Sequence, residues 1–214
     1  MRYLLAFALL VASPAVFAHH PLAGQEMTTL WHGVLSGLGH PLLGFDHLFF
    51  VLLVGVTALF TGSPRIAPLA YIATMLAGCV AVTFGLAVPG VEVAVAMTLL
   101  ALGAAGLSGK RLSILPACGL FAIAGAFHGA AFGASMASAE ASALGVVLFG
   151  YLVGLGVIQY ALCIGAGYAM TRIWGALEAD AMPARLAGAT VAGVGLFLSL
   201  EHLEGAAFAA LGVG

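Results

Sequence analysis

Residues 39–55 read GHPLLGFDHLFFVLLVG and place His40, Asp46 and His47 at the start of a long apolar run. An ionisable group inside a membrane is unfavourable, usually faces the interior of a helix bundle, and marks an ion path or a relay. The stretch therefore predicts two things at once: a membrane fold, and a polar site at one end of its first spanning helix.

The composition of the whole chain agrees with a membrane protein. Of its 214 residues, 63% are hydrophobic and 7% are charged, whereas soluble domains carry about 25% charged residues. A chain of this size cannot hide so much apolar surface from water. The net charge of −2 and the lack of a basic run give no reason to expect nucleic-acid binding. We therefore expect an all-α, polytopic membrane helix bundle in contact with the lipid bilayer.

The first 18 residues have the pattern of a secretory signal peptide. Arg2 supplies a positive charge, a short apolar stretch follows, and Val16-Phe17-Ala18 offers a small-residue cleavage site. Cleavage there leaves the mature N-terminus outside the cytoplasm. Residues 19–42 are then expected to form a periplasmic segment with a short interfacial helix over 26–38. An uncleaved membrane anchor is the alternative.

Residues 43–214 are predicted to form a six-helix transmembrane domain. A spanning helix needs about 20 apolar residues, and Pro, Gly or charged residues separate the candidate runs. The six predicted spans cover residues 43–61, 66–88, 91–107, 112–135, 142–171 and 185–204. Small residues four apart, such as Gly150 and Gly154, let helix backbones approach closely. We expect them to pack helices within one bundle, with the face of a homo-oligomer as the alternative.

Basic residues orient the predicted spans. The five that follow the signal peptide all fall in the loops after spans one, three and five: Arg65, Lys110, Arg111, Arg172 and Arg185. Because basic loops stay on the cytoplasmic side, this pattern places the mature N-terminus in the periplasm. After six spans the C-terminus is periplasmic too. We therefore expect a multi-pass protein of a bacterial inner membrane.

All histidines then map to the outer half of the protein, and two of them have an acidic residue beside them. The resulting candidate metal ligands are His19, His20, His32, His40, Asp46, His47, His128, Glu201 and His202. Imidazole and carboxylate are common ligands of borderline divalent metals. A single histidine at a helix end is more commonly an interfacial residue, but several at similar depth favour a metal or ion site.

The spacing within the opening stretch suggests a geometry. Pro41 suits the first position of a helix, and His40 would then directly precede that helix, as its N-cap or the residue leading into it. His40, Gly44 and His47 would then lie near one helix face, and Asp46 would point about 100° away from His47. From there Asp46 would orient an imidazole or bind the ion on a neighbouring face.

The segment His40-Pro41-Leu42-Leu43-Gly44-Phe45-Asp46-His47 resembles the first signature of the HupE/UreJ family, His-Pro-x-x-Gly-x-Asp-His, at every fixed position. The predicted architecture is also similar to that of the family. The resemblance implies a nickel or cobalt permease associated with hydrogenase and urease maturation. It further implies that His40, Asp46 and His47 are metal ligands at the outer entrance.

The second family signature, Phe-His-Gly-x-Ala-His-Gly-x-Glu, is only partly kept. It corresponds to residues 127–135, in which His128 remains. Phe132 and Ser135 stand where the family has a second His and a Glu. Two ligands that the resemblance implies are therefore missing, and other outer-side histidines or glutamates are the candidates to replace them.

The leading hypothesis is a secondary permease for a divalent transition-metal ion, nickel or cobalt first, with copper as an alternative. His19, His20 and His32 would capture the ion outside and pass it to His40 and the later ligands. The chain has no nucleotide-binding motif. The driving force for transport would therefore be a proton gradient, binding of the metal inside the cell, or the membrane potential. The membrane potential supplies about 2.3 kcal/mol per charge per 100 mV. The ion is the substrate, and we expect no tightly bound cofactor.

Two other functions stay open. The lost His and Glu favour a non-transporting relative, a metal-binding or accessory subunit of a larger membrane complex. Ser135 and His202 superficially resemble parts of an intramembrane serine hydrolase, but the chain has no Asn to stabilise an oxyanion. We therefore expect no enzymatic activity.

The inner halves of the predicted spans offer few ligands, among them Met75, Gln159 and Cys163. Gln159 is a polar group in the middle of the fifth span and needs a hydrogen-bond partner. Bonding between helices is its expected role, and it is also the best candidate for a relay in the middle of the membrane.

Overall fold

The computed structural model describes residues 26–134, 136 and 143–212. Over these residues the chain forms seven helices: α2 (Leu30–Leu43), α3 (Phe45–Leu59), α4 (Ala67–Thr83), α5 (Val91–Leu107), α6 (Ile114–Ala134), α7 (Leu144–Arg172) and α8 (Met182–Ala210). The predicted all-α helix bundle is confirmed. The signal peptide lies outside the described residues and stays a prediction.

Helix lengths divide the bundle into two groups. Within the described part, α6, α7 and α8 are each long and apolar enough to cross a membrane. The bent pair α2 and α3 adds a fourth span if it is counted as one. Helices α4 and α5 have 17 residues each, which is the lower limit for spanning, about 17 residues. The chain is a membrane helix bundle, and six complete spans stay a prediction.

The first predicted span differs from its expected geometry at Pro41 and Gly44. Pro41 does not open a helix: it lies with His40 in the last turns of α2. Because proline lacks a backbone N–H, it weakens that turn, and α2 ends at Gly44, whose backbone is extended (φ −83°, ψ 97°). The axes of α2 and α3 then differ by 84°. The prediction that His40 and His47 share one helix face is therefore wrong. The two side chains approach each other across the break between α2 and α3.

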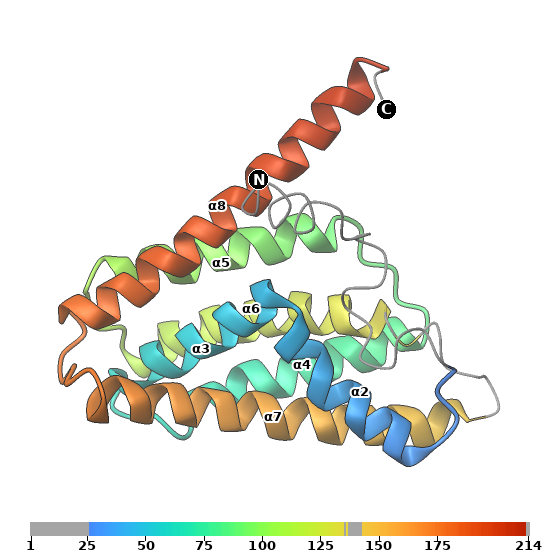
Figure 1. Cartoon of the computed structure of the whole chain (residues 1–214), viewed down its shortest axis with the longest axis horizontal. Helices are drawn as coiled ribbons and strands as arrows, with labels where there is room; N and C mark the ends of the chain where they lie inside the picture. Colours follow the sequence, from blue (N-terminus) through green and yellow to red (C-terminus); the bar gives the residue numbers. More distant parts are fainter. Residues whose placement is uncertain (1–25, 135, 137–142, 213–214) are drawn as a thin grey trace, which may run out of the picture.

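The helices pack as close pairs. Helix α4 lies along α6, α5 along α8, and both α2 and α3 lie against α7 (Figure 1). A Cβ atom at Gly150 or Gly154 would overlap the backbone of α2, and one at Gly188 would overlap the backbone of α5. The prediction that these small residues pack helices within one bundle is confirmed.

The basic residues that the sequence places in alternate loops also lie near one another in the structure. The connections α3–α4, α5–α6 and α7–α8 lie at one end of the bundle (Figure 1), and they carry or adjoin all five basic residues. Two contacts join these connections: Arg185 Nε donates to Leu107 O at 3.1 Å, and Arg111 lies 3.6 Å from Glu178. The positive-inside rule predicts that this end is cytoplasmic.

Candidate metal centre

Two imidazoles in direct contact form the centre of the candidate site. His47 lies in the first turn of α3 and His128 lies in α6, and their Nδ1 atoms are 2.8 Å apart. The exposed fraction of His47 is 7% and that of His128 is 0%. A hydrogen bond at this distance requires one Nδ1 to carry a proton and the other to present a lone pair.

Thr98 of α5 decides which ring is the donor. Its hydroxyl donates to Val95 O at 2.7 Å, and its oxygen lies 3.1 Å from His128 Nε2. Since the carbonyl takes the only hydroxyl proton, the oxygen accepts from Nε2–H of His128. In the neutral ring, Nδ1 of His128 then presents the lone pair and His47 donates. The sequence gives no reason to include Thr98 in the site, because a threonine in an apolar helix usually forms a hydrogen bond only to the backbone of its own helix.

Asp46 lies beside the other nitrogen of His47. Its Oδ2 atom is 3.8 Å from His47 Nε2, and its side chain is 23% exposed. This separation is too long for a hydrogen bond, but a carboxylate so close would stabilise a proton on Nε2 once Nδ1 gives up its own. Of the two roles expected for Asp46, the structure favours orienting an imidazole.

His40 occupies a separate position next to the pair. Its Nδ1 lies 3.0 Å from the hydroxyl of Tyr151 on α7, and its ring centre lies 6.3 Å from that of His47. Phe132 of α6 packs against both imidazoles, with ring centres 5.0 Å from His40 and 4.4 Å from His47. An apolar ring therefore fills the space between the two histidines, at the position where the resemblance implies a third.

The other predicted ligands are not gathered at this centre. His19 and His20 lie outside the described residues. His32, in the first turn of α2, accepts a hydrogen bond from Thr28 N at 3.2 Å. Glu201 and His202 lie in the C-terminal turns of α8, which are mostly exposed because they extend beyond the other helices (Figure 1).

The described residues do not complete a coordination shell. Among them, no group of three or more His, Cys, Asp or Glu side chains could hold a metal ion. What they bring together is one pair of imidazole nitrogens, with Asp46 beside one ring and Thr98 beside the other.

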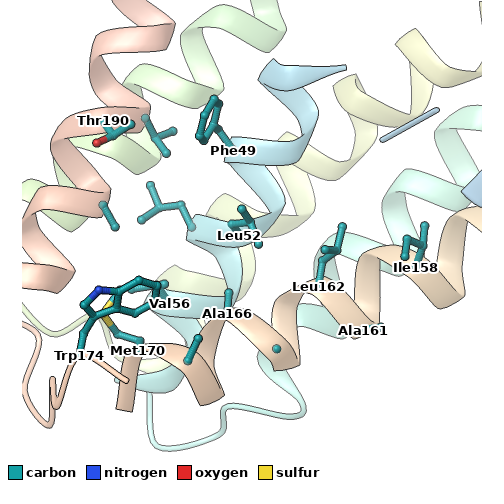
Figure 2. Close-up of a pocket in the computed structure, with 15 residues that line it drawn as sticks. Phe49, Leu52, Val56, Ile158, Ala161, Leu162, Ala166, Met170, Trp174 and Thr190 are labelled. Carbon is teal, nitrogen blue, oxygen red and sulfur yellow. The ribbon is translucent and has the colours of Figure 1, made fainter. Parts of the chain in front are cut away.

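A cavity of about 660 Å³ lies elsewhere, between α3, α7 and α8 (Figure 2). Its lining is almost entirely apolar and includes Phe49, Leu52, Leu162 and Trp174. The hydroxyl of Thr190, also in the lining, donates to Leu186 O at 3.0 Å. This cavity suits hydrocarbon, not a metal ion, and does not belong to the candidate centre.

Comparisons with known proteins agree with the signature in the sequence. The family described as HupE / UreJ protein matches residues 7–198, a range that includes both His47 and His128. The chain is also 32% identical over 168 residues to Protein HupE of Rhizobium leguminosarum bv. viciae. This alignment covers 78% of the chain and 84% of the relative. No solved structure matches the chain. A family match over most of the length and a relative of this similarity show that the chain belongs to the HupE/UreJ family.

Proposed function

We propose that the chain is a secondary permease for a divalent transition-metal ion, with nickel or cobalt as the preferred substrate. The observation that carries this proposal is the buried contact between His47 and His128 inside a membrane helix bundle. Ionisable groups in such a position mark ion paths, and imidazole is a good ligand for these metals. The ion is cargo, and we expect the protein to lie in a bacterial inner membrane with both termini in the periplasm.

The ligand type and the family support nickel or cobalt as the substrate. Imidazole nitrogen binds cobalt, nickel, copper and zinc, and the affinity rises from cobalt through nickel to copper. The 2.8 Å between the Nδ1 atoms of His47 and His128 is the length of the hydrogen bond that joins the two rings, so both rings must turn to present their lone pairs to one ion. Membership of the HupE/UreJ family favours nickel or cobalt, with copper as the competitor.

Binding of an ion would replace the proton between the two rings. His128 already presents a lone pair on Nδ1, because its one ring proton lies on Nε2, which donates to the Thr98 oxygen. His47 must move its proton from Nδ1 to Nε2, the nitrogen that lies 3.8 Å from Asp46. The Asp46 carboxylate stabilises that tautomer. In this mechanism Asp46 prepares His47 for the ion without being a ligand itself.

Metal uptake by cells tests the proposal. In nickel-limited cells that express the chain, we expect uptake of nickel and cobalt above the level of cells without it. His47→Ala should remove this uptake, because it removes half of the nitrogen pair. His202→Ala is the matched control: it also removes an imidazole, but from the exposed end of α8, and should leave uptake unchanged.

If the wild-type chain binds nickel but gives no uptake, the alternative function, a metal-binding accessory subunit, replaces the permease. If His47→Ala and His202→Ala have equal effects, the His47–His128 pair is not the site.

Replacing Phe132 with histidine should tighten metal binding. The new imidazole would stand between His40 and His47, whose ring centres lie 5.0 Å and 4.4 Å from the present ring. An additional nitrogen ligand should lower the apparent Kd for nickel by about 10-fold or more. Calorimetric titration of the purified protein measures this change. Phe132→Leu, which adds no nitrogen, should leave the Kd close to the wild-type value, and equal Kd values for both variants would contradict the expectation.

A further inference from the structure

We propose that Tyr71, Gln159 and Met75 form a second coordination station, to which the His47–His128 pair passes the ion. This inference rests on the proposed permease function and extends it from the entrance into the membrane. The ligands would be a phenolic oxygen, an amide oxygen and a thioether sulfur, and the substrate class is a divalent transition-metal ion.

The three side chains form one connected cluster between α4 and α7. The hydroxyl of Tyr71 donates to Gln159 Oε1 at 2.7 Å, and Gln159 Nε2 lies 3.6 Å from Met75 Sδ. All three side chains have an exposed fraction of 0%. The prediction that Gln159 needs a hydrogen-bond partner is confirmed, and its partners are groups that can also bind a metal.

The cluster is contiguous with the imidazole pair. The ring centre of Tyr71 lies 5.8 Å from that of His128. Phe50 packs against both, with ring centres 4.3 Å from His128 and 5.5 Å from Tyr71. Aromatic side chains thus enclose the step between the two stations, so that an ion passing along it is kept from lipid.

Tyr71 and Gln159 lie deeper than the pair, whereas Met75 lies level with Gly129, the residue after His128. Gly55 of α3 packs directly against Cys163 of α7. His47 precedes Gly55 by about two helical turns, whereas Gln159 precedes Cys163 by about one. Since α3 and α7 run in the same direction, Gln159 lies about one turn beyond His47, toward the end of the bundle that carries the basic loops. This is the direction of uptake.

The chemistry of the cluster suits release. An ion that leaves two imidazoles needs replacement ligands, which an apolar helix does not offer. Oxygen and sulfur donors without charge would hold a dication less tightly than a carboxylate or thiolate would. A transport path requires such sites, favourable enough to enter and weak enough to leave. A purely structural role, a hydrogen-bonded link between α4 and α7, is the competing explanation that the experiment must separate.

Tyr71→Phe removes one hydroxyl and keeps the ring beside His128. We expect nickel uptake to fall by about 10-fold or more, while nickel binding by the purified full-length protein stays unchanged, because the imidazole pair is intact. Tyr160→Phe is the matched control: it removes a hydroxyl that ties α7 to Arg65 O at 3.1 Å, and it should leave uptake unchanged. Equal effects of the two variants would overturn the station in favour of a structural link.

Met75→Leu allows a measurement that a packing defect would not change, the ratio of nickel to cobalt uptake. With nickel and cobalt offered together, a sulfur ligand sets the ratio in which they are taken up, because the two metals differ in their affinity for a given donor set. We expect the ratio of nickel to cobalt uptake to fall by several-fold. A packing defect would lower both metals equally and leave the ratio unchanged, and this result would overturn the role of Met75 as a ligand.

The two proposals fail in different ways. Normal uptake by Tyr71→Phe and an unchanged ratio in Met75→Leu, together with loss of uptake in His47→Ala, would overturn the deeper station and keep the permease. No uptake by the wild-type chain would remove the permease and the station with it.

Discussion

Replacing His128 with alanine should abolish metal uptake, and replacing His47 in the same protein should then make no further difference. The Nδ1 atoms of the two rings are 2.8 Å apart, and in the proposed permease they act together as one bidentate group. Once either nitrogen is lost, the other holds an ion only as a single ligand. We therefore expect each single variant to lose about 100-fold in uptake, and the double variant to lose about the same.

Uptake of radioactive nickel by the wild type, both single variants and the double variant measures this non-additivity. His128→Phe is the control for packing, because it keeps an aromatic ring between Phe50 and Tyr71 but has no nitrogen. It should be folded, as shown by its elution as a single species in detergent, and inactive. Losses that multiply in the double variant, as for two independent sites, would contradict the shared site.

Replacing Gly129 with alanine should destabilise the bundle strongly, although it adds only one methyl group. The three glycines Gly125, Gly129 and Gly133 lie four residues apart on α6, each against the backbone of α4. A Cβ atom at Gly129 would overlap the carbonyl of Met75. A main-chain carbonyl within a helix cannot rotate away, so α4 and α6 must separate. Overpacking of this kind costs about 3 kcal/mol, the upper part of the usual range.

Thermal unfolding in detergent measures the loss as a lower Tm. Gly119→Ala is the matched control, because it makes the same change on the same helix at an exposed position with no atom within 4 Å of the added carbon. Its Tm should stay close to that of the wild type. Gly129→Ala should also lose metal uptake, since it moves His128 and Met75 apart. Equal Tm values for the two variants would contradict the close approach of α4 and α6.

The positions of the helices were largely predictable from the sequence. Runs of apolar residues between glycine, proline and charged breaks placed α5 at its observed bounds, 91–107, and α4 and α6–α8 within a few residues at most ends. Hydropathy succeeds because, in a membrane, each backbone polar group must be satisfied within its own helix. Where that rule is relaxed, at Pro41 and Gly44, the prediction was wrong and the structure has a bend of 84°.

The candidate centre was predictable in part. The signature around His47 identified one imidazole, and the remnant of a second signature identified His128, but neither indicated that their Nδ1 atoms meet. Thr98, Tyr151 and Tyr71 complete the surroundings of the centre, and each is of a residue type that is common in apolar helices. Their roles depend on which side chain faces them from another helix.

The sequence by itself determined that the chain lies in a membrane, roughly where most of its helices begin and end, and which residue types could hold a metal. These properties are local, since each depends on the composition of one segment. Only the tertiary structure decided which faces meet. The helices are apolar on nearly every side, so no amphipathic pattern marks the inward face. The inward face of each helix is set by close approach at the glycines and by the need to satisfy buried polar groups. Together they bring His47 to His128 and Tyr71 to Gln159.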